Sequence, residues 1–123
     1  MRTLFALLLV LCVTTGCSHA KKPSDLGEDS ESTLHVNNHG FGDVDIYVVH
    51  DGSRIRVGSV TATAEQTFTL NSRVIGRGGT MQLIAHAVGT SGSLNSESFA
   101  IRPGMQIDWT LESNLSRGSL AIY

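Results

Sequence analysis

Polar and apolar residues alternate with a period of two along most of the chain after residue 32. Successive side chains of an extended strand point to opposite faces, so this alternation predicts half-buried β-strands. Turn-forming residues recur at intervals of about 8 to 12 positions between the apolar runs. The pattern predicts strands at 33–37, 43–50, 54–60, 66–71, 80–88, 97–102, 106–112 and 119–123. No segment shows the stripe of an amphipathic helix.

Short strands with evenly spaced turns are typical of a sandwich or a barrel. A folded region of about 90 residues buries roughly 60 to 65% of the surface of its unfolded chain, which supports one modest core. We therefore expect an all-β protein, a single small antiparallel β-sandwich of about seven or eight strands. The predicted domain covers residues 33–123 of the 123-residue chain.

The best-specified local structure is a hairpin at Asp51-Gly52, because Asp-Gly is a preferred pair in two-residue type I′ turns. Such a loop fixes four cross-strand pairs: Ile46 with Val57, Tyr47 with Arg56, Val48 with Ile55, and Val49 with Arg54. The pairs alternate between an aliphatic inward face and a mixed outward face. On the outward face, Arg56 would lie beside the ring of Tyr47 and make a cation–π contact.

A second hairpin is predicted to turn at residues 103–105. A three-residue loop there pairs two apolar sets on one face: Ile101 with Ile107, and Phe99 with Trp109. A two-residue Pro-Gly loop would break this pattern, so the register favours the longer loop.

The predicted core consists of the residues with inward parity: Leu34, Val36, Val44, Ile46, Val48, Ile55, Val57, Val60, Phe68, Leu70, Leu83, Ala85, Phe99, Ile101, Ile107, Trp109 and Leu111. The parity of residues 80–88 stays open, because Ile84 and Val88 compete with Leu83 and Ala87 for the inward face.

The first 16 residues have the organisation of a signal peptide. Met1-Arg2-Thr3 carries positive charge, and residues 4–13 form an uncharged run that is too short to span a bilayer. The next residues, Thr14-Thr15-Gly16-Cys17, resemble the lipobox of bacterial lipoprotein precursors. Gly16 and Cys17 occupy its two strictest positions, whereas Thr14 stands where leucine is usual.

The resemblance implies that cleavage falls before Cys17, that its thiol takes a diacylglycerol, and that its new amino group is acylated. Two or three acyl chains hold a protein firmly on a membrane, so the membrane is the first expected partner. Ser18, rather than aspartate, follows the cysteine, which in this family implies the outer membrane. The alternative is cleavage after Ala20, which would release a secreted or periplasmic protein.

Cysteine usage and charge narrow the possible functions. Cys12 and Cys17 are the only two cysteines, so the predicted domain has no disulfide and no cysteine-based metal or catalytic site.

Residues 17–32 carry few apolar side chains and form a tether, whose roughly 15 residues span on the order of 20 Å. From residue 32 onward the chain has six arginines, seven acidic residues and no lysine. This balance excludes the basic face of nucleic-acid-binding proteins.

Candidate chemical groups are dispersed. The domain has four histidines, at positions 35, 39, 50 and 86, and His35, His39 and the pair His50-Asp51 could supply ligands for a metal. Nothing in their spacing requires a site, so we expect no metal and no cofactor. Asp43 and Asp45 share a strand face at a separation near that of glycosidase carboxylates, yet exposed carboxylates usually protect a strand edge.

Two further features have competing interpretations. The segment Gly76-Arg77-Gly78-Gly79 could cradle an anion with its N–H groups, but it lacks the lysine and the following helix of a phosphate loop, so a turn is favoured. Trp109 and Tyr47 are the aromatic candidates for stacking on a sugar. Trp109 has inward parity and is expected in the core, whereas Tyr47 points outward and stays a candidate contact.

Val44-Asp45-Ile46-Tyr47-Val48, followed by Asp51-Gly52, Gly58 and Val60, resembles the opening of small Ig-like or transthyretin-like sandwich domains of bacterial envelope proteins. The resemblance transfers no functional residue. It agrees with a non-enzymatic, lipid-anchored accessory or binding protein of the cell envelope, with an envelope protein or a polysaccharide as partner. The alternatives are an inhibitor or regulatory subunit of an envelope enzyme, acting through residues 76–80 or 89–96, and a small hydrolase or metal-binding protein.

Overall fold

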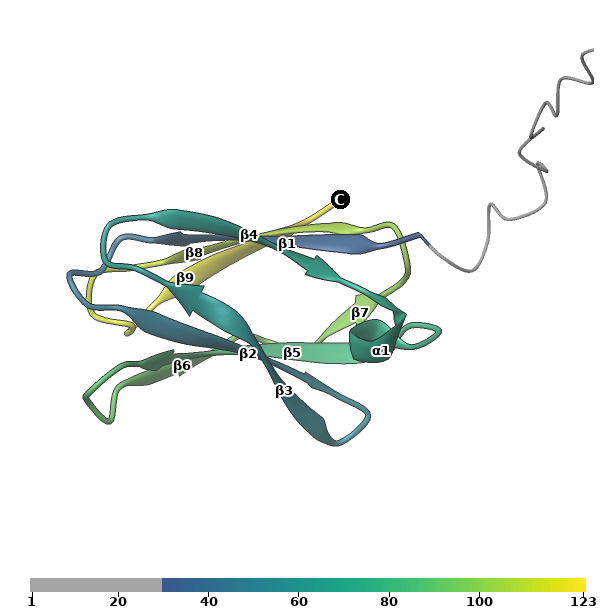
Figure 1. Ribbon diagram of the computed structural model, residues 1–123, viewed down its shortest axis with the longest axis horizontal. Helices are drawn as coiled ribbons and strands as arrows, with labels where there is room; N and C mark the ends of the chain where they lie inside the picture. Colours follow the sequence, from purple (N-terminus) through teal and green to yellow (C-terminus); the bar gives the residue numbers. More distant parts are fainter. Residues whose placement is uncertain (1–29) are drawn as a thin grey trace, which may run out of the picture.

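The computed structural model describes residues 30–123. The predicted signal peptide, Cys17 and residues 18–29 of the tether lie outside the described residues, so the inferences about them stay predictions. Within residues 30–123 the chain forms nine strands and one short helix, arranged as two sheets packed face to face (Figure 1). The predicted all-β sandwich is confirmed.

The elements, in chain order, are β1 (Ser32–Asn38), β2 (Val44–His50), β3 (Ser53–Val60), β4 (Glu65–Leu70), α1 (Ser72–Ile75), β5 (Gly79–Ala87), β6 (Ser93–Asn95), β7 (Phe99–Ile101), β8 (Gln106–Leu111) and β9 (Gly118–Ile122). All eight predicted strands are present, with bounds that differ by at most two residues. The short β6 and α1 were not predicted, because neither is long enough to show a period.

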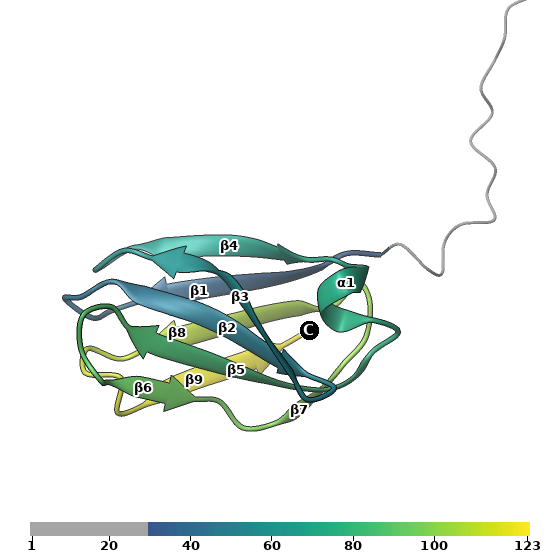
Figure 2. The same cartoon turned by 60° about the horizontal axis from the view of Figure 1, so that its bottom comes forward.

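One sheet has the order β4-β1-β8-β9, and the other has the order β3-β2-β5-β6, with β7 also paired to β5. The pairing of β1 with β8 is parallel, and the other ladders are antiparallel. Segments 39–43, 61–64, 88–92 and 112–117 gather at one end, on the left in Figure 1, which we call the loop end. At the opposite end, the tether end, β1 begins beside α1 (Figure 2).

The predicted hairpin at Asp51-Gly52 is confirmed. Both residues have positive φ, 49° and 75°, as a type I′ turn requires. Three of the four predicted pairs are found: Tyr47 with Arg56, Val48 with Ile55, and Val49 with Arg54. The predicted pairing of Ile46 with Val57 is wrong, because a bulge shifts the register and sets Ile46 opposite Gly58.

The bulge brings the backbone of Gly58 against the ring of Phe68 in β4. A Cβ atom on Gly58 would lie only 2.4 Å from Cε1 of Phe68, so the position has room for glycine alone. This contact closes the side of the sandwich between β3 and β4, one edge strand from each sheet.

The predicted hairpin at residues 103–105 is wrong. β7 pairs with β5, whereas β8 pairs with β1 and β9 in the other sheet, so the turn crosses between sheets. Ser32 holds the crossing: its Oγ donates to the carbonyl of Arg102 (3.0 Å) and accepts from the N–H of Met105 (3.2 Å). Both sheets of a sandwich point their inward residues into the same core. The alternation of apolar residues is therefore the same whether the turn joins two strands of one sheet or crosses to the other sheet.

The predicted core is largely confirmed, and β5 turns Met81, Leu83 and Ala85 inward, which settles the parity that was open. Val57, Phe68 and Phe99 are only partly buried, and Ile55 is half-buried outside the core cluster. Ile75 and Met81 were missed. Ile75 of α1 is buried with 1% exposure and packs into the core cluster.

We expect Gly58→Ala to destabilise the fold by about 1 to 3 kcal/mol, because the added methyl group overpacks the Phe68 ring. Urea denaturation followed by circular dichroism measures the change. Gly42→Ala is the matched control, since a Cβ at Gly42 would meet nothing within 4 Å. Phe68→Leu should recover part of the loss in the Gly58→Ala background; equal losses for the variants at 58 and 42 would contradict the packing argument.

Candidate binding site at the loop end

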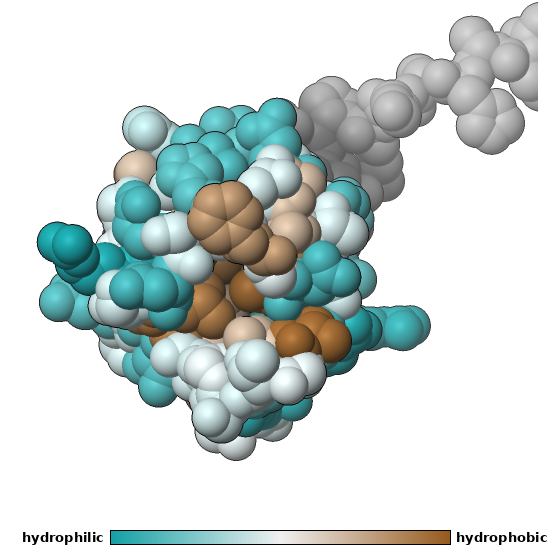
Figure 3. All heavy atoms as spheres, turned by 90° about the vertical axis from the view of Figure 1, so that its left-hand side faces the viewer, coloured by the Kyte–Doolittle hydropathy of each residue, from teal (hydrophilic) through white to brown (hydrophobic). Residues whose placement is uncertain are grey.

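An apolar hollow lies at the loop end of the sandwich. It has a volume of about 230 Å³, and its apolar lining comes from Val44, Ala87, Val88 and Leu115, which lie far apart in the sequence. Figure 3 looks onto this end and shows hydrophobic surface gathered in the hollow, with polar surface around it. We call this hollow and its rim the cup.

Large apolar side chains stand exposed around the cup. Within residues 30–123 the exposed large hydrophobic residues are Phe41, Val88 and Tyr123, and the first two belong to the loop end. Phe41 is 86% exposed and follows Gly40, which lines the cup. Burying such a side chain yields about 1.5 to 3 kcal/mol, so its exposure beside an apolar hollow marks an interaction surface.

Asn38, the last residue of β1, fixes the segment that carries Phe41. Its side chain is fully buried, and its Nδ2 donates to the carbonyls of Gly42 (2.9 Å) and Thr61 (3.1 Å). Its Oδ1 accepts from the N–H of Gly40 (2.9 Å), where a Cβ would come within 2.9 Å of that oxygen. The buried amide is therefore satisfied by the loops, which hold one conformation before any partner binds.

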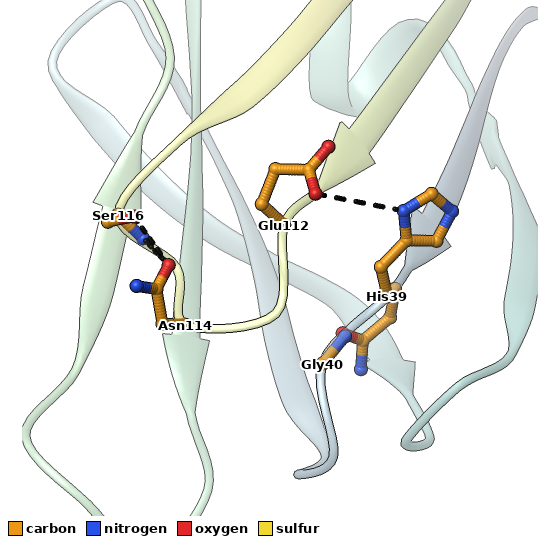
Figure 4. A network of polar contacts seen from close by, with 6 residues as sticks. His39, Gly40, Glu112, Asn114 and Ser116 are labelled. Atoms are coloured by element: carbon orange, nitrogen blue, oxygen red, sulfur yellow. Dashed lines mark hydrogen bonds and ion pairs between the residues drawn. The ribbon is translucent and has the colours of Figure 1, made fainter.

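The opposite wall of the cup is held by a second set of polar contacts (Figure 4). His39 Nδ1 lies 4.0 Å from Oε2 of Glu112, which follows β8. Asn114 Oδ1 accepts from the N–H (3.1 Å) and the hydroxyl of Ser116. Leu115 between them has a positive φ of 53°, and its N–H donates to the carbonyl of Glu112 (3.1 Å). This tight turn presents Leu115 to the cup.

The charges near the cup are already engaged. Oδ1 of Asp43 accepts from the N–H of Ala62 (3.0 Å), and Glu112 faces His39. The floor thus offers apolar contact rather than a charged anchor. Its volume is below the range of about 300 to 1,000 Å³ that drug-sized ligands occupy, so it suits one apolar side chain of a partner.

Sequence reasoning did not identify this site, because its parts come from four separate segments. One local signal was present: Gly40-Phe41-Gly42 places an aromatic residue between two glycines in a turn. Such a side chain has no strand neighbour to pack against, so it is a candidate for an exposed binding contact. Asn38 carried no comparable signal, because its burial depends on the carbonyls of a distant turn.

The histidines do not converge on a metal site. His35 lies on the outer face of its sheet, with Nε2 3.4 Å from Glu65 and Nδ1 3.7 Å from Asp108. The two carboxylates thus face different nitrogens of the ring, so one metal ion cannot bind both carboxylates and the imidazole. His39 is at the loop end and His50 is at the tether end, so the candidate metal ligands His35, His39 and His50-Asp51 do not lie together. Residues 30–123 contain no group of three or more metal-ligating side chains.

His50 has a structural contact. Its Nδ1 lies 2.9 Å from the carbonyl of Thr80, and its ring is 6% exposed. Because Nδ1–H donates there, Nε2 is the acceptor of the neutral ring, and it has no hydrogen-bond partner among the described residues. An oxygen of the exposed Asp51 carboxylate lies 3.3 Å from Nε2.

The expected cation–π contact at Tyr47 is present, but Arg54 makes it rather than Arg56, which lies directly opposite Tyr47 in the ladder. The guanidinium of Arg54 covers the tyrosine ring at 4.0 Å, diagonally across the ladder, while Arg56 donates to Asp45 (2.7 Å). Hydrogen bonds from Arg56 and from Ser59 lower the pKa of Asp45. An ion pair with a direct hydrogen bond is the stronger contact for Arg56, which leaves the ring to Arg54. One face of Tyr47 is therefore occupied and not free for a sugar.

The other candidates also have structural roles. Asp43 and Asp45 accept hydrogen bonds from different groups, the N–H of Ala62 and the guanidinium of Arg56. The N–H of Gly76 donates to Ser72 and that of Gly78 to Ile75, both at 2.9 Å, so the glycine-rich segment closes α1 instead of cradling an anion. Trp109 is 2% exposed and lies in the core, as predicted.

No protein-family model matches the chain, and no curated protein matches it either. Within residues 30–123, none of the helical structure has the length and apolar character needed to cross a bilayer.

We expect Asn38→Ala to cost about 1 to 3 kcal/mol of stability, because it leaves the buried N–H of Gly40 without a partner and removes the bonds to the part-buried carbonyls of Gly42 and Thr61. Asn114→Ala is the control: it removes an exposed amide that contacts only Ser116, so it should cost less than about 0.5 kcal/mol. Thermal and urea unfolding compare the two variants. A similar loss in both would show that the buried amide does not organise the loops.

Proposed function

We propose that this protein is a non-enzymatic binding protein of the bacterial cell envelope, anchored through lipid on Cys17, that engages a protein partner at the cup. The observation that carries the proposal is the rigid, apolar cup with Phe41 at its rim. Preorganised loops lower the entropic cost of binding, and an aromatic side chain beside a small pocket is the usual composition of a binding hot spot.

The position of the cup supports this function. β1 begins at the tether end, and the cup lies at the other end of the same strands. An attachment at residue 32 leaves all four cup segments accessible to a partner. Ser18 after the lipidated cysteine favours the outer membrane; cleavage after Ala20 is the alternative and would place the same cup on a secreted or periplasmic protein.

An inhibitor that uses residues 76–80 or 89–96 is less well supported. Gly79 and Thr80 belong to β5 and pair with β7, and Ser93–Asn95 form β6. Only Gly79–Thr80 of the first segment and Ser93–Asn95 of the second are paired within the sheet, but neither segment presents an exposed large apolar side chain. A partner at the cup accounts for the exposed Phe41, which the inhibitor model leaves unexplained.

Labelled palmitate should enter the wild-type protein in a lipoprotein-exporting bacterium and should not enter Cys17→Ser. The thiol of Cys17 is the attachment point that the lipobox implies, and serine offers no thioether. Gel fluorography of the immunoprecipitated protein measures incorporation. Equal labelling of both forms would refute the anchor, and loss of the first 20 residues without labelling would establish cleavage after Ala20.

Binding of the partner should depend on Phe41. The soluble chain 17–123 carrying Cys17→Ser is immobilised and exposed to envelope extract, with a photoactivatable crosslinker because residues 32–123 contain no lysine. Phe41→Ser should weaken the captured complex at least tenfold, the equivalent of about 1.4 kcal/mol.

Tyr123→Ser is the matched control, since Tyr123 is also an exposed aromatic residue, 72% accessible, at the opposite end. It should leave capture unchanged. Undiminished capture by Phe41→Ser would exclude the cup as the binding site. Retention on purified peptidoglycan or polysaccharide, without a protein partner, would replace a protein ligand with a cell-wall ligand.

A further inference from the structure

Within residues 30–123 the two sheets have five edge strands, because β6 and β7 both pair with one side of β5, and four of the five carry protection against pairing with another chain. β3 has two arginines and a bulge, β4 begins with Glu65 and packs on β3, and β6 and β7 have only three residues each. Charges, bulges and short length are the common means by which proteins block edge pairing. β9, with the sequence Gly-Ser-Leu-Ala-Ile, has no charge, no proline and no bulge.

The free side of β9 also offers unpaired backbone groups. Tyr123 and Gln106 exchange both hydrogen bonds, with N···O distances of 2.9 and 3.2 Å. Since these pairs alternate along an antiparallel ladder, Ser119 and Ala121 likewise face β8. The N–H and C=O groups of Gly118, Leu120 and Ile122 then point away from β8, and they bond to no described residue outside the ladder.

The same three residues have inward parity. Leu120 pairs with Trp109, and Ile122 pairs with Ile107, both of which lie in the core. Beside them, between β9 and the β6–β7 edge, runs a groove of about 420 Å³ whose apolar lining includes Leu94 and Phe99. A strand added to β9 would therefore gain backbone bonds and cover apolar surface.

We propose that two copies of this chain associate through β9, antiparallel, about a twofold axis at Leu120. Leu120 then lies opposite its counterpart, and Gly118 lies opposite Ile122 of the partner copy. Each of these pairs exchanges both backbone bonds, because all three residues have outward-pointing N–H and C=O groups. A twofold contact needs a self-complementary surface, and this parity supplies it.

A second copy fits the edge better than an unrelated strand for a further reason. Its Leu120 and Ile122 arrive on the inward face, where they pack against their counterparts over the mouths of the two grooves. The outward face brings Ser119 opposite Ala121 of the partner copy, and both side chains are small and uncharged. The interface leaves both cups free, because β9 runs beside the sandwich and the cup is at its end.

The oligomeric state of the chain 17–123 carrying Cys17→Ser tests this association, measured by size-exclusion chromatography with light scattering over a series of concentrations. We expect a mass twice that of the single chain. The double variant Ser119→Lys, Ala121→Lys should halve this mass, because it sets like charges opposite each other across the axis. Ser119→Glu with Ala121→Glu should halve it as well.

Mixing the lysine and glutamate double variants should restore the twofold mass as a heterodimer, which a structural defect would not do. The control is Thr67→Lys with Thr69→Lys, two exposed positions on the outer face of the edge strand β4, which should stay dimeric. The proposal is overturned if the wild type is a single chain at every soluble concentration, if the β9 charges leave the mass unchanged, or if the mixture stays monomeric.

Disulfide trapping tests the register. Ser119→Cys mixed with Ala121→Cys should give a linked heterodimer on mild oxidation, because opposite residues of this type have Cα atoms about 4.5 Å apart. Each variant alone should stay unlinked, since the residue faces its own counterpart only diagonally, about 7 to 8 Å away. Linking of either variant with itself, without linking in the mixture, would contradict the axis at Leu120.

Discussion

The sandwich depends on alternate burial in its two central strands. β1 lies between β4 and β8, β2 lies between β3 and β5, and every second residue of each strand is buried. Leu34, Val36, Ile46 and Val48 have no exposed surface. Residues 30–123 contain no cysteine, so no disulfide joins the sheets there, and each large buried side chain contributes about 1.5 to 3 kcal/mol of apolar stabilisation.

The loop end takes its order from the same strands. Asn38 ends β1 inside the sandwich, and its amide donates to both turns, 39–43 and 61–64, which are also joined by hydrogen bonds from Thr63 N–H to the Gly40 carbonyl and from Ala62 N–H to Asp43. A buried amide contributes little net free energy even when its bonds are made, but it is costly to leave without partners, so it selects one arrangement of the loops. Phe41 lies outside the core cluster, whereas Val44 belongs to it and also lines the cup.

The sequence allowed prediction wherever structure is decided locally. The strands follow from alternation, and the Asp51-Gly52 turn follows from the backbone preference of two residues. The crossing after Ile101 could not be foreseen, because hairpin and crossing satisfy the same parity. The four-residue α1, capped by Asn71, covers little more than one helical turn, which is too short to show a repeating apolar stripe. The cup needed four distant segments in contact, and its only local sign was a phenylalanine between glycines.

The parallel pairing of β1 with β8 has a mechanical consequence. Any force carried by the N-terminal segment enters at Ser32, the first residue of a strand that is bonded on both sides. The hydrogen bonds of a ladder run across the strands, so a pull along β1 loads both ladders in shear, with all bonds sharing the load. A ligand pulling from the loop end would act along the same axis. Tension between Ser32 and the loop end would therefore be borne along the strands without peeling a sheet open.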